Sequence, residues 1–210
     1  MKTNTNKAEV SGNALAAAGV AQSPETVNEL IARIRSKDDK VRGPAWQGAA
    51  LAGASAVKPL AEVMMDPDFE IARAAKRGLS RIVRHAGRPG AKREAKAVAA
   101  ELVQLLQSPH ALVRREAVWM LSEIGEDGVI APMAVLLADP EAREDARCAL
   151  MRFAGRQATS AFRSAFLSAP EDFKYALAES LRERGVKVDG YPSPKVVPSR
   201  KTTVGEPPNQ

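Results

Sequence analysis

The chain has 210 residues, a single cysteine and a formal net charge of +6. This length suffices for a stable core without disulfide or metal staples. Cys148, being alone, excludes an internal disulfide framework and favours a reducing compartment. No apolar run approaches the roughly 20 residues that a membrane-spanning helix needs, so we expect a soluble, cytoplasmic protein that does not act at a membrane.

Residues 1–22 form a polar leader without sustained periodicity. Lys2 and Lys7 precede the small-residue stretch 14–21, an arrangement that secretory signals also have. Glu9 and the residues after it interrupt any apolar segment of such a signal. We therefore predict a disordered leader, with a cleaved signal as the alternative.

Residues 23–185 carry an almost unbroken helical periodicity, with few aromatic residues and abundant alanine. This composition is typical of helices whose backbones approach closely over small side chains. We predict one all-α domain over residues 23–185, followed by a disordered Pro-rich tail over residues 186–210.

Two segments of this domain are similar to each other. Residues 57–67 read VKPLAEVMMDP and residues 130–140 read IAPMAVLLADP. Each has a proline where the first turn of a helix tolerates one, then an apolar stripe, then Asp-Pro. We expect this aspartate to cap the next helix and the proline to occupy its first position. Related breaks, each predicting a new helix, stand at Ser23-Pro24, Ser108-Pro109 and Ala169-Pro170.

The helices after these breaks share a predicted buried stripe. Small or apolar anchors recur at intervals of 30, 42, 29 and 31 residues, with a second apolar position four residues after each anchor. The anchors are Ala45, Ala75, Ala117, Ala146 and Leu177, and the second positions are Ala49, Leu79, Leu121, Leu150 and Leu181. Glycines stand where a left-handed residue would end these helices, at Gly53, Gly125, Gly155 and Gly185.

The combined pattern of Asp/Ser-Pro, Val-Arg (Val41-Arg42 and Val113-Arg114), Ala-x-x-x-Leu and a terminal glycine resembles the HEAT-repeat family. The variant most similar in length is the short, roughly 30-residue HEAT-like repeat that is also found in phycobilin lyase subunits. The resemblance covers about residues 24–185 and implies a right-handed α-solenoid of about five antiparallel helix pairs. It also implies a binding scaffold, because the family motif encodes packing and capping rather than chemistry.

Few residues suggest catalysis. His85 and His110 lie in different repeats, with no His, Cys or carboxylate at a metal-ligand spacing. Acidic groups at 123–127 and 141–145 are more typical of solvated helix faces and caps. We predict no enzymatic activity, no catalytic residue, no cofactor and no metal site. An accessory subunit of a lyase-like enzyme is the alternative that would involve chemistry.

A rotation of 100° per residue from each anchor predicts which side chains leave the core. Around Ala75, the inward residues are Ile71, Leu79 and Ile82, and the outward ones are Arg73, Arg77, Ser80 and Arg84. Around Ala117, the inward residues are Val113, Leu121 and Ile124, and the outward ones are Arg115, Trp119 and Ser122. In a HEAT-like stack the second helix of each pair lines the inner surface, so the outward residues of the two helices would share a face.

Trp119 is a candidate anchor because outward-facing tryptophans often carry interfaces. The alternative is that Trp119 packs under a neighbouring repeat or a folded-back tail. Trp46, on the flank of its helix, is predicted to pack between repeats. Cys148 occupies the position equivalent to Trp119, and we expect it to be exposed.

The 42-residue interval contains an insertion at 85–93, which we predict to be an exposed basic loop. From residue 73 to residue 96, nine basic residues oppose one acidic residue, a net charge of +8 that exceeds the charge of the whole chain. We predict an acidic protein or peptide partner, with nucleic acid as the second candidate and a solvated face without a ligand as the third. The predicted partner-binding residues are Arg73, Arg77, Arg84, Arg88, Lys92, Arg93, Arg115 and Trp119.

Overall fold

The computed structural model describes residues 24–193, with side chains from residue 27 onward. All regular structure within these residues is helical, which confirms the predicted all-α class. The chain divides into two compact units, the first ending at Val129 and the second beginning at Ile130. The predicted leader and the tail after residue 193 lie outside the described residues.

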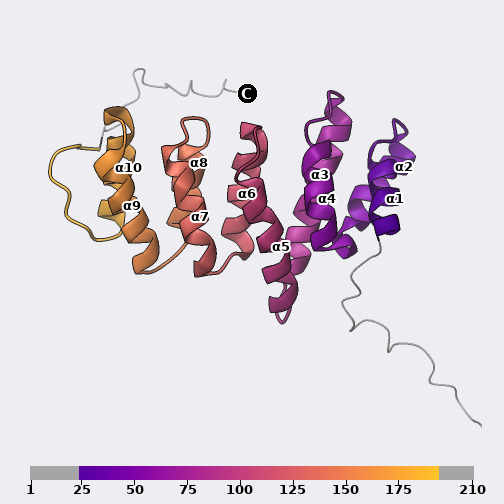
Figure 1. Ribbon diagram of the computed structural model, residues 1–210, viewed down its shortest axis with the longest axis horizontal. Helices are drawn as coiled ribbons and strands as arrows, with labels where there is room; N and C mark the ends of the chain where they lie inside the picture. The colour runs from indigo at the N-terminus through magenta and orange to yellow at the C-terminus, as the bar shows by residue number, and fades with distance from the viewer. Residues whose placement is uncertain (1–23, 194–210) are drawn as a thin grey trace, which may run out of the picture. The chain divides into compact units, whose positions relative to one another are not determined.

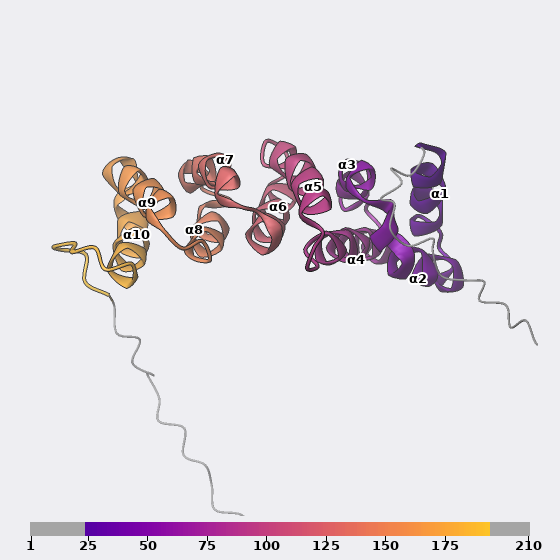
Figure 2. The same ribbon diagram turned by 90° about the horizontal axis from the view of Figure 1, so that it is seen from below.

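The first unit consists of three helix pairs (Figure 1). Its α-helices are α1 (Pro24–Ile34), α2 (Asp39–Gly48), α3 (Val57–Val63), α4 (Phe69–Ala86), α5 (Lys92–Leu105) and α6 (Ala111–Ile124). Short 3₁₀ turns follow α2 and α6, namely η1 (Ala49–Ala52), η2 (Ala54–Ala56) and η3 (Asp127–Val129). Figure 2 shows α1, α3 and α5 on one side of this unit and α2, α4 and α6 on the other.

The second unit consists of two helix pairs. They are formed by α7 (Ile130–Val135), which continues into the 3₁₀ turn η4 (Leu136–Ala138), α8 (Arg143–Met151), α9 (Arg156–Ser168) and α10 (Glu171–Glu183). Within this unit α7 and α9 again lie on one side, and α8 and α10 on the other (Figure 2).

The predicted stripe is the core of both units. All five anchors and all five second positions are at most 2 % exposed. They lie on α2 with η1, α4, α6, α8 and α10, which are the second helices of the five pairs. Because each fully buried leucine contributes about 1.5–3 kcal/mol relative to an exposed one, the stripe stabilises the packing of the helices within each unit.

The Asp-Pro breaks begin helices in a different way from the prediction. Asp66 accepts a hydrogen bond from the backbone N–H of Asp68, and Asp68 then caps α4 by accepting from the N–H groups of Glu70 and Ile71. Asp139 likewise accepts from the N–H of Glu141, and α8 begins only at Arg143. The predicted capping by the Asp-Pro aspartate is therefore wrong, because its carboxylate closes a turn two residues on and leaves the proline outside the helix.

Of the four predicted glycine stops, only Gly185 ends its helix as predicted. Gly185 has a φ of 75°, and the N–H of Val186 bonds back to the carbonyl of Leu181, as in a Schellman cap. Gly53 has a φ of 61° but a ψ of −156°, outside the left-handed helical region, and Gly155 is the N-cap of α9 with a φ of 93° and a ψ of −177°. Gly125 instead has a φ of −73°, and a Cβ there would lie 2.6 Å from the Leu121 carbonyl oxygen. Gly125 is thus required by close packing and not by a left-handed backbone.

The predicted loop at 85–93 is confined to residues 87–91, because residues 85–86 end α4 and residues 92–93 begin α5. α4 has 18 residues and α5 has 14, and only residues 87–91 connect them. The extra residues therefore lengthen both helices, because the apolar periodicity of α4 continues through Ile82, Val83 and Ala86, which are buried.

Residues 186–193, at the start of the predicted tail, contact the last helix pair. The ring of Tyr191 packs edge-to-face on Phe166 and on Tyr175, with centroid distances of 5.3 and 5.2 Å. Arg182 donates hydrogen bonds to the Tyr191 carbonyl and to the Ser193 hydroxyl. This segment, which appears as the yellow loop beside α10 in Figure 1, thus covers part of the last pair.

Candidate functional site

The outward face of α4 carries the predicted arginines. Arg73, Arg77 and Arg84 are exposed, whereas Ile71, Leu79 and Ile82 are at most 5 % exposed. The predicted orientation of α4 is therefore confirmed. It follows from the helical period alone, because arginines at a spacing of four and seven residues lie on one side of a helix.

The equivalent face of α6 lies beside α4 in the first unit. Arg115 is exposed and Trp119 keeps 36 % of its accessible surface, while Val113 and Leu121 are buried. Ile124, at the end of α6, is only half-buried, so its side chain leaves the core in part and the predicted inward orientation is only partly confirmed. Lys76 of α4 forms an ion pair with Glu116 of α6, which links the two helices on this side.

Carboxylates from outside residues 73–96 offset part of the positive charge of that segment. Arg73 bonds to Glu70 at 2.6 Å, and Lys76 pairs with Glu116. Neither glutamate belongs to residues 73–96, so the sequence count of +8 overstates the local field. The Lys76–Glu116 pair depends on the packing of α4 against α6, which cannot be seen when charges are counted along the sequence.

Three arginines of α4 make no such pair. Among the side chains of residues 27–193, no carboxylate lies within ion-pair distance of Arg77, Arg81 or Arg84. The guanidinium carbons of Arg77 and Arg81 instead lie 5.1 and 5.7 Å from the ring centroid of Trp46 on α2. The predicted packing of Trp46 between repeats is confirmed, and its cation–π contacts with two arginines are new.

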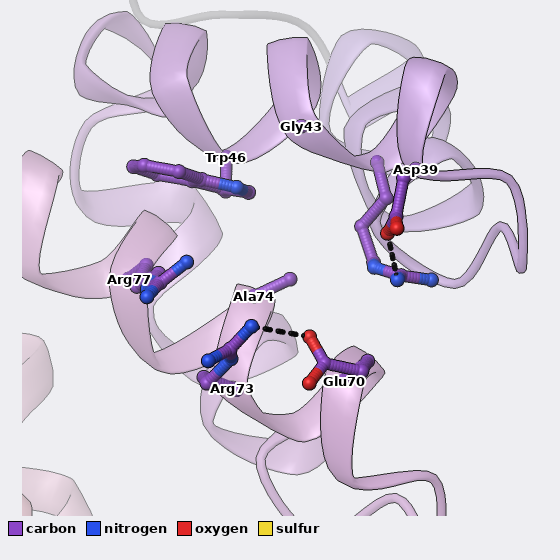
Figure 3. Close-up of a pocket in the computed structure, with 8 residues that line it drawn as sticks. Asp39, Gly43, Trp46, Glu70, Arg73, Ala74 and Arg77 are labelled. Atoms are coloured by element: carbon purple, nitrogen blue, oxygen red, sulfur yellow. Dashed lines mark hydrogen bonds and ion pairs between the residues drawn. The ribbon is translucent and has the colours of Figure 1, made fainter.

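A hollow of about 220 Å³ lies between α2 and α4 next to this contact (Figure 3). Glycine and alanine, at Gly43 and Ala74, make part of its wall, and the remaining lining is charged or aromatic: Asp39, Arg42, Trp46, Glu70, Arg73 and Arg77. Figure 3 shows Arg77 below the Trp46 ring, and Arg73 and Glu70 paired at the lower edge. The sequence did not predict Trp46, Asp39, Arg42 or Glu70 as site residues, because the hollow depends on how two helices align.

Arg42 has a structural role within the hollow. It is only 6 % exposed, donates to the Ser36 carbonyl at 2.7 Å and pairs with Asp39. Arg114 donates in the same way to the Ser108 carbonyl at 2.8 Å. In both Val-Arg motifs the arginine therefore ties its helix to the connection six residues earlier.

Arg88, a predicted binding residue in the connection between α4 and α5, bonds to neighbouring residues of the chain. Arg88 donates to both carboxylate oxygens of Glu94, at 2.7 and 2.6 Å, and to the carbonyl of His85. These hydrogen bonds lower the pKa of Glu94 and raise the pKa of Arg88. Lys92 and Arg93 are exposed in the first turn of α5.

The described residues contain one free thiol and no candidate metal site. Among the described residues, no group of three or more His, Cys, Asp or Glu side chains could hold a metal ion. Cys148 is half-buried rather than fully exposed, and Arg147 lies 3.4 Å from its sulfur. In the same part of the chain, no helix is both long and apolar enough to cross a bilayer.

Paired helices with a repeated core stripe and repeated arginine ties define an α-helical repeat protein. The chain belongs to the HEAT-repeat family: the model for HEAT repeats matches residues 57–151 and 99–182, which together cover more than half of the sequence. No curated protein matches. Among solved structures, the crystal structure of an engineered protein is 23 % identical over 76 % of this chain and 79 % of that chain, with a TM-score of 0.38.

Proposed function

We propose that this chain is a non-catalytic interaction scaffold that binds an acidic protein or peptide through the face formed by α4 and α6. The observation that carries the proposal is the set of exposed arginines, Arg77, Arg81 and Arg84, without carboxylate partners among the described side chains. Unpaired cations on one face raise the rate at which the protein associates with an anionic partner, and they raise its specificity for such a partner. Arg115 and Trp119 extend this face with the residue types that dominate interface energetics.

Two further cations support a role in binding rather than in folding. Lys92 and Arg93 stand in the first turn of α5, where the helix dipole disfavours positive charge. Their position costs stability, so a contribution to partner binding explains them better than a contribution to the fold. Arg73 and Arg88 are already paired with Glu70 and Glu94, and we assign them a supporting role.

The test compares two double variants with equal changes in charge. Arg77→Glu/Arg84→Glu changes the proposed face, and Arg156→Glu/Arg163→Glu changes two exposed arginines of the second unit. Labelled hexaglutamate serves as the probe, with binding measured by fluorescence anisotropy at about 50 mM salt, where screening is weak. We expect the face variant to lose about tenfold or more in affinity and the control to stay within about twofold. Equal affinities for the two variants would contradict the proposal, provided that both have the same helical content by circular dichroism.

A nucleic acid is the competing partner, because unpaired arginines also neutralise phosphates. Oligothymidylate in the same assay separates the two classes. Tighter binding of oligothymidylate than of hexaglutamate, with a steep salt dependence that Arg77→Glu/Arg84→Glu removes, would overturn the acidic-peptide proposal.

A further inference from the structure

We infer that the hollow between α2 and α4 is the seat for one carboxylate side chain of the acidic partner, bound by Arg77 beside the ring of Trp46. The inference rests on the proposed function and deepens it, since it assigns one partner side chain to one place on the scaffold. Four features of the hollow support it: the placement of Arg77, the charge balance of the lining, the size, and the open space above Gly43.

The Trp46 ring positions Arg77 for this contact. The guanidinium carbon lies 5.1 Å from the ring centroid, and Figure 3 shows the Arg77 side chain below the ring, where both groups line the hollow. A guanidinium that lies over an aromatic face keeps N–H groups available on the side away from the ring, where a planar carboxylate can accept two of them. The ring therefore reduces the rotamer freedom that Arg77 would lose on binding.

The charge balance favours a singly charged group. Three guanidinium groups and two carboxylates line the hollow, which leaves a net charge of +1. Asp39 is paired with Arg42 and Glu70 with Arg73, so Arg77 supplies the uncompensated charge. One carboxylate balances it. A phosphate monoester, with a charge of about −1.5 to −2, would meet repulsion from Asp39 and Glu70.

The dimensions favour a side chain over a small-molecule ligand. Small-molecule sites usually measure about 300–1,000 Å³, and this hollow is about 220 Å³. A Cβ added at Gly43 would meet no atom within 4 Å, so the space above the α2 backbone is open. A larger residue at position 43 would fill the seat without disturbing its charges.

The experiment uses this open space. Gly43→Leu fills the seat, and Gly48→Leu is the control, because Gly48 is also on α2, has no atom beyond its chain neighbours within 4 Å of its Cβ position, and does not line the hollow. Both variants and their reference carry Pro44→Ala, because a side chain that precedes proline disfavours the helical backbone. With labelled hexaglutamate as the probe, we expect Gly43→Leu to weaken binding about fivefold or more and Gly48→Leu to change it less than twofold. Arg77→Lys keeps the charge but loses the planar fork, and we expect it to weaken binding more than Arg84→Lys does.

A local readout comes from Trp46 itself. The chain has two tryptophans, so in a Trp119→Phe background Trp46 is the only indole emitter. Because Trp119 belongs to the proposed face, the affinity of this background for hexaglutamate is first measured by anisotropy, and the titration extends above the dissociation constant found. We expect its emission to change saturably with hexaglutamate, and this change to vanish when Gly43→Leu is added.

The outcomes separate the seat from the proposed function. Unchanged affinity in Gly43→Leu, together with loss of binding in Arg77→Glu/Arg84→Glu, would overturn the seat and leave the scaffold proposal standing. Unchanged binding in both would contradict the two proposals together. Displacement of the peptide by inorganic phosphate, at concentrations where acetate has no effect, would assign the hollow to phosphate groups and overturn the carboxylate inference.

Discussion

Arg77 of α4 makes a cation–π contact with Trp46 of α2, with 5.1 Å between the guanidinium carbon and the ring centroid. The contact joins the second helices of two successive repeats and forms one wall of the hollow. A double-mutant cycle with Trp46→Leu and Arg77→Met should give a coupling of about 0.5–1 kcal/mol in the free energy of unfolding, because the pair is partly exposed. Urea denaturation measures it. Strictly additive single effects would show that the contact does not stabilise the packing of the two repeats.

Two Leu→Ala substitutions test the core stripe. Leu121 is fully buried at a second position of the stripe, and Leu167 on α9 is 82 % exposed. We expect Leu121→Ala to destabilise its unit by about 2–5 kcal/mol, since truncation leaves a cavity as well as lost apolar burial. Leu167→Ala should change stability by less than about 0.5 kcal/mol. Similar denaturation midpoints for the two variants would mean that the stripe is not the core.

Two Gly→Ala substitutions should act in opposite directions. Gly48, the last residue of α2, has a φ of −84° and space around its Cβ position, so Gly48→Ala should stabilise the first unit by about 0.5–1 kcal/mol. Gly185 has a φ of 75° in its cap, so Gly185→Ala should destabilise the second unit by about 1 kcal/mol. Thermal unfolding monitored by circular dichroism gives both signs, and a stabilising Gly185→Ala would contradict the cap.

The Arg88–Glu94 pair predicts a pH dependence at the turn between α4 and α5. Hydrogen bonds from Arg88 lower the pKa of Glu94 below its usual 4.5, with a smaller contribution from His85. A lowered carboxyl pKa stabilises the folded state above the unfolded pKa, and this contribution disappears as the pH falls through the folded pKa. Wild type should therefore melt at a higher temperature than Glu94→Gln at pH 7, and the difference should shrink as the pH falls below 4.5 toward 3.

Glu101→Gln, on the same helix, is the control for this effect. No ion pair of Glu101 is found among the described side chains, so its melting temperature should match wild type at both pH values. A difference between wild type and Glu94→Gln that does not shrink at pH 3 would assign the effect to packing instead of charge.

The core and the outward faces of the helices could be predicted from the sequence because they depend on local periodicity. Ala75 and Leu79 are buried and Arg77 is exposed for the same reason, the rotation of 100° per residue. The repeat of this pattern along the chain also predicted the family. Each of these features is fixed within one helix or by comparison of two segments.

Features that depend on the alignment of two helices were not predictable in this way. The contact of Trp46 with Arg77 and the pairing of Lys76 with Glu116 require the register between neighbouring helices. The Asp-Pro pattern predicts Asp66 as the cap of α4, whereas the capping residue is Asp68. The carboxylate of Asp66 instead accepts a hydrogen bond from the Asp68 N–H in the preceding turn. The Gly-Pro signal at 87–90 predicts the connection, but its bounds are shorter than the insertion because the apolar periodicity of α4 continues through Val83 and Ala86.

The most direct test of the central claim is an inversion of charge preference. The ratio of affinities for hexaglutamate and hexalysine is measured for wild type and for Arg77→Glu/Arg84→Glu under the same low-salt conditions. The account predicts that wild type prefers hexaglutamate and that the variant prefers hexalysine, because the two substitutions reverse the uncompensated charge of the α4 face. An unchanged preference for hexaglutamate in the variant would place the acidic partner elsewhere on the molecule and contradict the account.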